Sequence, residues 1–257
     1  TAFFCDLRGF TTLSQAMEPQ ALVALLNDYM SAMTELVFRH DGVLDKYIGD
    51  EIMAFWNAPM DQPDHAKRAC ATALDMVRRL HELRAQWKGR GTPQLDLGIG
   101  INTGPMVVGN MGSRDRLAYT VLGDAVNIAS RLQGVNKDYG TRVLVSEATM
   151  QAAGESFTYR YLDRVQVKGR TEPLAVYEVV SYQHQIDPEA AAMLELYAKG
   201  IERYHAGQWT SAADLFDGLL ASHPGDGPSA LYLRRSREFA ATPPPPDWNG
   251  VTILKTK

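Results

Sequence analysis

Two short β-rich runs, hinged at Gly49-Asp50 and flanked by two long amphipathic patterns, limit the folds open to this chain. The runs cover residues 43–48 and 51–56, and Gly-Asp is ordinary turn chemistry, so they predict a β-hairpin. On either side, residues 20–38 and 63–88 repeat apolar side chains at helical spacing, which predicts two helices with one apolar face each. A hairpin between two such helices favours a sheet that the helices cover.

The alternation of strands and helices continues to about residue 182. Residues 95–102 and 105–109 read as a second strand pair around Gly104. The sequence therefore predicts an α+β domain over residues 1–182, with a mixed, mainly antiparallel sheet and packed helices. The remaining expected elements are strands at 117–122, 142–145, 157–167 and 174–180 and a helix at 124–138.

The composition changes after residue 182, where strand signals become rare. The spacing of Tyr197, Gly200, Tyr204, Gly207 and Trp209 resembles a tetratricopeptide-type helix pair, and a plain helical hairpin is the alternative. A single repeat cannot bury its own apolar face, so it is expected to pack on the main domain, a partner or a second copy. The parts expected of this C-terminal all-α extension, residues 183–257, are helices over 187–241, a Pro-rich spacer at 243–246 and a terminal strand within 248–254.

Composition and charge exclude several classes of protein. The 257 residues are 45% hydrophobic and 22% charged, as in ordinary globular proteins, and the net charge of −4 argues against a nucleic-acid-binding surface. Cys5 and Cys70 are too few for a disulfide framework or a zinc site, which favours a cytoplasmic setting. No apolar run approaches the roughly 20 residues that span a bilayer. The chain opens in a strand-like run without an initiator Met, so we expect a fragment of a longer protein whose N-terminal part has room for a sensor or membrane region.

Asp6 and Asp50 each follow a run that reads as a β-strand. Strand ends can hold two carboxylates close together, and at about 4 Å, with an effective dielectric of about 20, they repel by about 4 kcal/mol. A divalent cation removes that repulsion, and hard oxygen ligands suit Mg²⁺ or Mn²⁺, ions that usually accompany a phosphate substrate. Each aspartate alone has an ordinary alternative, a solvated Asp-Arg pair at Asp6 and a simple turn at Asp50.

The residues after Asp6 favour a phosphate ligand. Gly9 allows a tight turn, and Phe10 and Thr11 lead into a helix whose free N–H groups attract phosphate oxygens. Arg8 adds a positive charge to the same segment. These features predict that Gly9, Phe10 and Thr11 contact the phosphates of a substrate.

Other polar residues stand at suggestive spacings. Lys46 lies four residues before Asp50, while Asn127 and Arg131 share one helix face at positions i and i+4. Lys168 precedes a glycine near the end of the expected domain. Taken alone, Lys46 is usually a solvated strand lysine, and Asn127 with Arg131 is usually a polar helix face. Lys168 is usually a lysine in a turn. It is their joint occurrence, in order, that indicates a function.

Taken together, these runs closely resemble the class III nucleotidyl cyclases, the family of adenylate and guanylate cyclase catalytic domains. The resemblance covers roughly residues 1–180. It implies intramolecular attack of a ribose 3′ oxygen on the α-phosphorus, with release of pyrophosphate. In this family Asp6 and Asp50 would bind two divalent cations, Mg²⁺ or Mn²⁺.

The resemblance also assigns the remaining residues. Asn127 would orient the ribose, Arg131 would stabilise charge on the α-phosphate and Lys168 would contact the terminal phosphates. In the family the metal-binding aspartates come from one subunit, and the other groups come from its partner. A chain that carries every piece is therefore expected to form a head-to-tail homodimer.

Lys46 and Thr120 stand at the positions that select the base in this family. Lysine can only donate, which suits adenine N1, whereas Thr120 can accept from the adenine N6 amino group but can also donate. Many family adenylate cyclases have Asp at the Thr120 position. In having threonine at this position, the chain resembles a bacterial subgroup of adenylate cyclases that also includes the bicarbonate-responsive soluble enzymes. The sequence thus predicts an adenylate cyclase that uses ATP, and the alternatives are a guanylate cyclase, a catalytically silent nucleotide-binding module, and a scaffold that acts through its helical extension.

Overall fold

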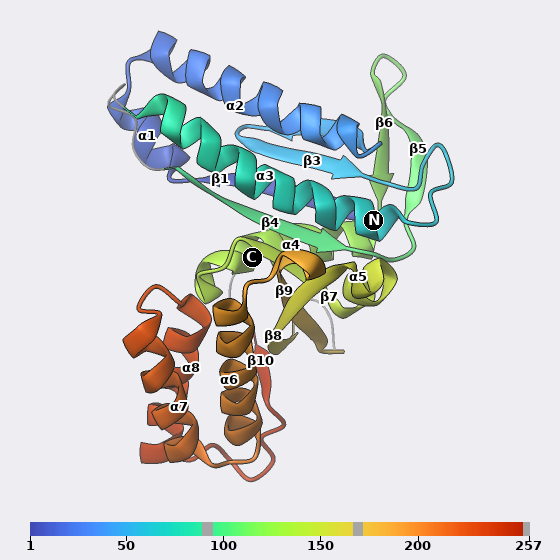
Figure 1. Ribbon diagram of the computed structural model, residues 1–257. Coiled ribbons are helices and arrows are strands. Elements are labelled where there is room, and N and C mark those ends of the chain that lie inside the picture. The colour runs from blue at the N-terminus through green and yellow to red at the C-terminus, as the bar shows by residue number, and fades with distance from the viewer. Residues whose placement is uncertain (89–94, 167–171, 254–257) are drawn as a thin grey trace. The chain divides into compact units, whose positions relative to one another are not determined.

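The computed structural model describes residues 1–88, 95–166 and 172–253, and the chain divides into two compact units. The first comprises residues 1–136 and 142–156, and the second comprises residues 137–141 and 157–257. Figure 1 labels their helices and strands. The predicted boundary at residue 182 does not coincide with the junction of these compact units, and as a domain boundary it stays a prediction.

The first unit is built on strands in the order β7-β4-β1-β3-β2. Strand β1 runs antiparallel to both of its neighbours, β3 and β4, while β4 and β7 are parallel. The predicted mixed, mainly antiparallel sheet is therefore confirmed. The elements of this unit are β1 (Ala2–Arg8), α1 (Phe10–Ala16), α2 (Pro19–Arg39), β2 (Val43–Ile48), β3 (Glu51–Phe55), α3 (His65–Trp87), β4 (Asp96–Asn102), β5 (Val107–Gly112), β6 (Leu117–Leu122), α4 (Asp124–Tyr139, whose last turn belongs to the second unit), β7 (Val143–Ser146), α5 (Glu147–Ala153) and the short 3₁₀ turn η1 (Gly154–Ser156).

Helix α4 packs very closely on strand β4. A Cβ atom added to Gly100 would lie 2.1 Å from the backbone nitrogen of Gln133 and 2.2 Å from the carbonyl oxygen of Ala129. Only glycine permits this approach of helix and strand backbones. Asn136 adds a buried hydrogen bond from its side-chain amide to the Ile99 carbonyl, 2.8 Å long.

Helices α2 and α3 pack against each other beside the sheet (Figure 1). Helix α2 is long and apolar enough to cross a membrane by length and composition alone, although no such run was expected from the sequence. Its residues Leu25, Tyr29, Met33 and Val37 are buried in this unit, and the Tyr29 hydroxyl lies 3.4 Å from Cys5 Sγ on β1. These contacts are those of a core helix.

The predicted pairing of residues 95–102 with 105–109 is wrong. Strand β5 pairs with β6 in a separate two-stranded antiparallel hairpin, with Gly109 opposite Thr120. Turn chemistry around Gly104 looked like a hairpin, but β4 already has β1 and β7 as its two neighbours. Strand β5 therefore finds its partner further along the chain.

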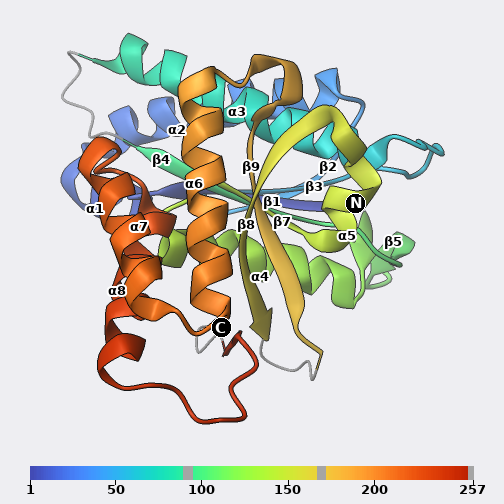
Figure 2. The ribbon, with the colours of Figure 1, turned by 60° about the horizontal axis from the view of Figure 1, so that its bottom comes forward.

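In its described residues, the second unit combines three strands with three long helices. Strands β8 and β9 are antiparallel, and β10 joins β8 in parallel, which confirms a terminal strand in the tail. Helices α6, α7 and α8 lie side by side in Figures 1 and 2, and α7 packs against both of the others. The elements are β8 (Phe157–Gln166), β9 (Leu174–Tyr182), the 3₁₀ turn η2 (Gln183–Gln185), α6 (Pro188–His205), α7 (Trp209–Ser222), α8 (Gly227–Ala241) and β10 (Val251–Ile253).

Aromatic packing and buried charges hold the second unit together. Gly200 on α6 lies under the Phe216 ring of α7, where an added Cβ would stand 2.7 Å from ring carbons. Asp163 on β8 accepts hydrogen bonds from Tyr139, Arg235 and Thr252 at 2.7, 2.7 and 2.8 Å. The helices predicted over 187–241 are thus confirmed, whereas their likeness to a tetratricopeptide repeat stays a prediction.

Gly100→Ala is expected to destabilise the first unit, because the new methyl group would collide with the backbone of α4. We expect a loss of at least about 3 kcal/mol, followed as a lower urea midpoint by circular dichroism. Gly134→Ala on the same helix is the matched control, since no atom lies within 4 Å of its added Cβ. That change should stabilise by about 0.5–1 kcal/mol, and equal midpoints for the two variants would contradict the close contact.

Candidate active site

Strand pairing brings Asp6 and Asp50 together. Strand β1 runs antiparallel to β3 with Cys5 opposite Ile52, so Asp6 stands at the end of β3 where Asp50 closes the turn from β2. Gly49 makes that turn with a φ of 67°, in the left-handed region. The two carboxyl groups lie close enough to hydrogen-bond when one of them carries a proton.

Burial and neighbouring charges at this end of the sheet raise the pKa values of Asp6 and Glu51. Burial, reinforced by the Asp50 charge and the hydrogen bond to Asp50, raises the pKa of Asp6 to about 6. Burial also raises the pKa of Glu51 to about 7, with added repulsion from Asp6 and Asp50. Glu51 was not among the predicted site residues, although its place directly after Asp50 was the signal for it. Three acidic groups therefore interact at one end of the sheet.

The donor set of Asp6 and Asp50 fits a hard divalent cation. Two carboxylates that repel each other for lack of a counter-charge would bind such an ion. Within residues 1–88, 95–166 and 172–253, no group of three or more His, Cys, Asp or Glu side chains has metal-binding geometry.

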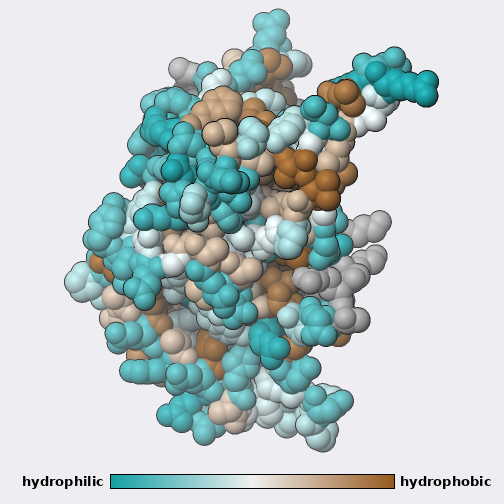
Figure 3. Space-filling view, turned by 90° about the vertical axis from the view of Figure 1, so that its right-hand side faces the viewer, coloured by the Kyte–Doolittle hydropathy of each residue, from teal (hydrophilic) through white to brown (hydrophobic). Residues whose placement is uncertain are grey.

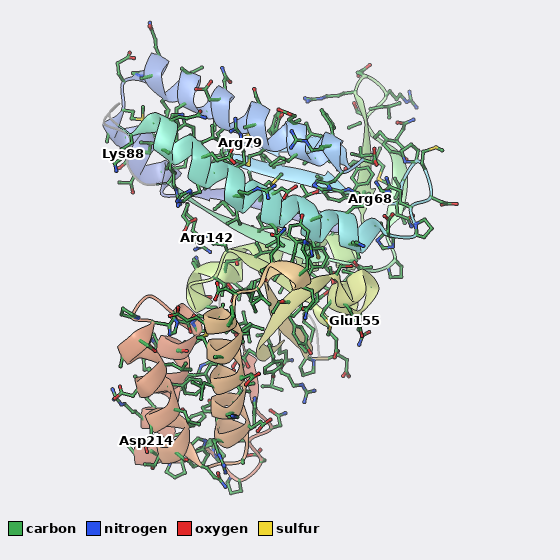
Figure 4. The ribbon with its side chains drawn as sticks, viewed as in Figure 1. Arg68, Arg79, Lys88, Arg142, Glu155 and Asp214 are labelled. Carbon is green, nitrogen blue, oxygen red and sulfur yellow. The ribbon has the colours of Figure 1, made fainter. Side chains whose placement is uncertain are left out.

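The turn after β1 has the predicted form. Gly9 adopts a φ of 81° and precedes α1, whose first turn has no side-chain cap. The backbone N–H groups near Phe10 and Thr11 are thus not occupied by a capping side chain. Arg8 lies elsewhere: its guanidinium stands beside Gly98 on β4, close to Asp96. Asp96 accepts a hydrogen bond of 2.9 Å from Arg142, the residue labelled in Figure 4.

Lys46 and Thr120 meet across strands β2 and β6. The Lys46 ammonium donates to the Thr120 hydroxyl at 3.3 Å, so the structure brings together two residues that are 74 positions apart. Asp45 joins them: it accepts a hydrogen bond from the Thr120 hydroxyl, and its Oδ1 lies 3.1 Å from Lys46 Nζ in an ion pair. Asp45 was not among the predicted site residues.

Asn127 and Arg131 lie on one face of α4, as predicted. Asn127 is exposed and Arg131 is partly exposed, while Val126, Ala129 and Leu132 on the opposite side are buried. Among the described residues, no hydrogen bond or ion pair links Asn127 or Arg131 with the Asp6–Asp50 pair or with the Lys46–Thr120 pair. The predicted phosphate ligand Lys168 lies outside the described residues.

Comparison with known proteins places this geometry in a family. The family model described as the adenylate and guanylate cyclase catalytic domain matches residues 1–181. Adenylate cyclase 1 of Rhizobium meliloti is 40% identical over 191 residues, which are 74% of this chain and 29% of that protein. The chain thus spans less than a third of the length of that relative.

Two solved structures have the same fold. The adenylyl cyclase CyaB from P. aeruginosa superposes with a TM-score of 0.67 at 34% identity, covering 72% of this chain and 95% of that one. The guanylyl cyclase Cya2 superposes with a TM-score of 0.65 at 36% identity, covering 72% and 93%. These matches confirm the α+β cyclase fold expected from the motifs. The chain belongs to the family of adenylate and guanylate cyclase catalytic domains.

Proposed function

We propose that this protein is an adenylate cyclase, which converts ATP into 3′,5′-cyclic AMP and pyrophosphate. The observation that carries the proposal is the contact between Asp6 and Asp50 at the end of β1, in a chain of this family. Its acidic end of the sheet needs a cation, and a nucleoside triphosphate brings phosphates that share that cation.

Asp6 and Asp50 would hold two divalent cations, Mg²⁺ or Mn²⁺, which lower the pKa of the 3′ hydroxyl and neutralise the phosphates. Asn127 orients the ribose, and Arg131 stabilises charge that builds up on the α-phosphate. Lys168 and the N–H groups of Gly9, Phe10 and Thr11 contact the phosphates. The 3′ oxygen forms its bond to the α-phosphorus as the bond to pyrophosphate breaks, and the hydroxyl proton passes to solvent.

The Lys46–Thr120 pair supports ATP as the substrate. The lysine donates to adenine N1, and the threonine hydroxyl accepts from the N6 amino group. A guanylate cyclase is the second candidate, because Cya2 is a guanylyl cyclase and is 36% identical to this chain. It is disfavoured because guanine N1 carries a hydrogen that would face the Lys46 ammonium.

The site is proposed to form across a head-to-tail homodimer. Arg131 and Asn127 lie on an outward face of α4 and make no described hydrogen bond or ion pair to the acidic pair of their own chain, which suits a role toward a partner chain. The β5–β6 hairpin also exposes Val107, Leu117 and Leu122, which are 67%, 64% and 57% exposed. Figure 3 faces this side of the first unit and shows hydrophobic residues gathered on its upper part.

The proposal has three further parts. The catalytic chain lies in the cytoplasm, and a sensor or membrane region lies outside the sequence. The helical extension has a tetratricopeptide-like role. The region outside the sequence is supported by the length of the Rhizobium relative, of which the matched residues cover 29%.

The first prediction concerns metal-dependent activity. The purified chain with Mn²⁺ and ATP should release cyclic AMP and pyrophosphate, separated by chromatography, and EDTA should stop the reaction. Asp6→Ala and Asp50→Ala should each lower kcat by at least about 10³, because both ions depend on these carboxylates. More Mn²⁺ should be needed below about pH 6, where the proton on Asp6 competes with the metal.

The control for this prediction is Asp61→Ala, since Asp61 is exposed and lies outside the acidic group. Near-normal activity in Asp6→Ala or Asp50→Ala would contradict the assignment of these residues as ligands of two metal ions.

The second prediction tests whether sites are shared between two chains. Asp50→Ala and Arg131→Ala should each be nearly inactive alone and regain activity when mixed, because one of the two sites in a heterodimer is intact. Statistical mixing predicts a recovery of up to about one quarter of the wild-type rate. Two differently tagged chains would prove subunit exchange, and exchange without recovery would place each site within one chain.

The third prediction concerns the base. Lys46→Glu should lower kcat/KM for ATP roughly 5- to 150-fold, because a carboxylate would face the lone pair of adenine N1 at a typical cost of about 1–3 kcal/mol. Some use of GTP should appear, since glutamate can accept from guanine N1–H. The measurement is kcat/KM for both nucleotides, and an unchanged ATP-to-GTP ratio would mean that Lys46 does not read the base.

A further inference from the structure

We propose that Asp45 is a positioning residue that fixes the direction of the Thr120 hydroxyl and so makes the base pocket select a purine with a 6-amino group. This inference rests on the proposed function, since it concerns the base of the nucleotide substrate. It answers a question that the threonine leaves open, because a hydroxyl alone can either accept from adenine N6 or donate to guanine O6.

The first supporting observation is a β-bulge at Asp45. In the pairing of β2 with β3, Leu44 stands opposite Ala54 and Lys46 opposite Met53, so Asp45 is an extra residue without its own partner. Neighbouring side chains of a regular strand point to opposite faces. Here, however, both Asp45 and Lys46 reach the same Thr120 hydroxyl. The bulge has re-aimed one of the two side chains toward it.

The second observation is the burial of the Asp45 carboxylate. Its side chain is 0% exposed, whereas that of Lys46 is 44% exposed. One carboxylate oxygen accepts from the Thr120 hydroxyl, and the other lies 3.1 Å from Lys46 Nζ without a well-aligned hydrogen bond. A buried carboxylate needs hydrogen-bond donors and a counter-charge, and in this structure Thr120 and Lys46 supply them.

The hydrogen-bond donors and acceptors that these contacts leave free determine which base fits the pocket. The single proton of the Thr120 hydroxyl is used on Asp45, and one of its two lone pairs accepts from Lys46. The remaining lone pair can only accept, which matches the N6–H of adenine. Lys46 keeps a further N–H for adenine N1. The pocket therefore presents one donor and one acceptor, in the pattern that adenine requires.

Guanine O6 would need the opposite arrangement. Thr120 could donate to O6 only by withdrawing its proton from Asp45, which leaves a buried carboxylate oxygen without its donor. A carboxylate cannot donate in return, so Asp45 allows one orientation of the hydroxyl. An asparagine at this position would remove the restriction, because its amide can donate to Thr120 and free the threonine proton for the base.

The test compares ATP with purine riboside triphosphate, which lacks any group at position 6. The full chain is assayed with both nucleotides as wild type, Asp45→Asn, Thr120→Val and the double variant. Asp45→Asn should reduce the kcat/KM advantage of ATP over purine riboside triphosphate about five- to tenfold, the usual worth of one hydrogen bond. In the Thr120→Val background Asp45→Asn should change that ratio by less than about twofold, since no hydroxyl remains to be oriented.

Two controls separate this role from general damage. Asp61→Asn changes an exposed carboxylate in the same way and should leave the ratio as in wild type. Asp45→Ser also carries a donor for Thr120, so it should reproduce the shift of Asp45→Asn and replaces it if the asparagine variant folds poorly. A merely structural role would lower the rates with both nucleotides equally and leave their ratio unchanged.

An unchanged ratio in active Asp45→Asn and Asp45→Ser would overturn the role of Asp45. An equal shift of the ratio by Asp45→Asn with and without the Thr120 hydroxyl would overturn it as well. Failure of the proposed function looks different, because the wild-type chain would then cyclise neither nucleotide.

Discussion

The antiparallel pairing of β1 with both β3 and β4 is the constraint on which the rest of the first unit depends. It places Asp6 at the end of the sheet where the β2–β3 turn delivers Asp50, and it fixes the neighbouring strand β4 against which α4 packs. Repulsion between the two carboxylates would otherwise weaken this pairing. A proton on Asp6 relieves this repulsion below about pH 6, and the proposed divalent cations would relieve it at neutral pH.

Much of this arrangement could be predicted from the sequence. The periods of apolar residues located α2, α3 and the β2–β3 hairpin to within two residues, because each of these elements buries one face and shows it in its pattern. The motifs predicted Asp6 and Asp50 at strand ends; Asp50 lies in the β2–β3 turn as expected of a hairpin, whereas Asp6 lies inside β1, which continues to Arg8. Asn127 and Arg131 could be assigned to one face of a helix, since helical spacing alone determines that relation.

What the sequence could not provide was register and partner choice. Strand β5 was assigned to the wrong neighbour, because local turn chemistry says where a chain turns and not which strand it meets. Asp45 was overlooked for a related reason: period-two alternation predicts that it points away from Lys46, and only the bulge brings both to Thr120. Glu51 was missed because its raised pKa arises from burial and from two neighbouring charges, which are properties of the folded strand end.

The glycine contact between β4 and α4 has a consequence for how such an enzyme can be switched. With backbone atoms of helix and strand in contact at Gly100, α4 has no room to turn about its axis or slide independently of the sheet. The backbone of α4 at Asn127 and Arg131 is thereby fixed relative to β4. In the proposed homodimer, a regulatory signal that brings these side chains toward or away from a bound nucleotide would therefore displace one whole catalytic unit against the other, and α4 would keep its place on the sheet.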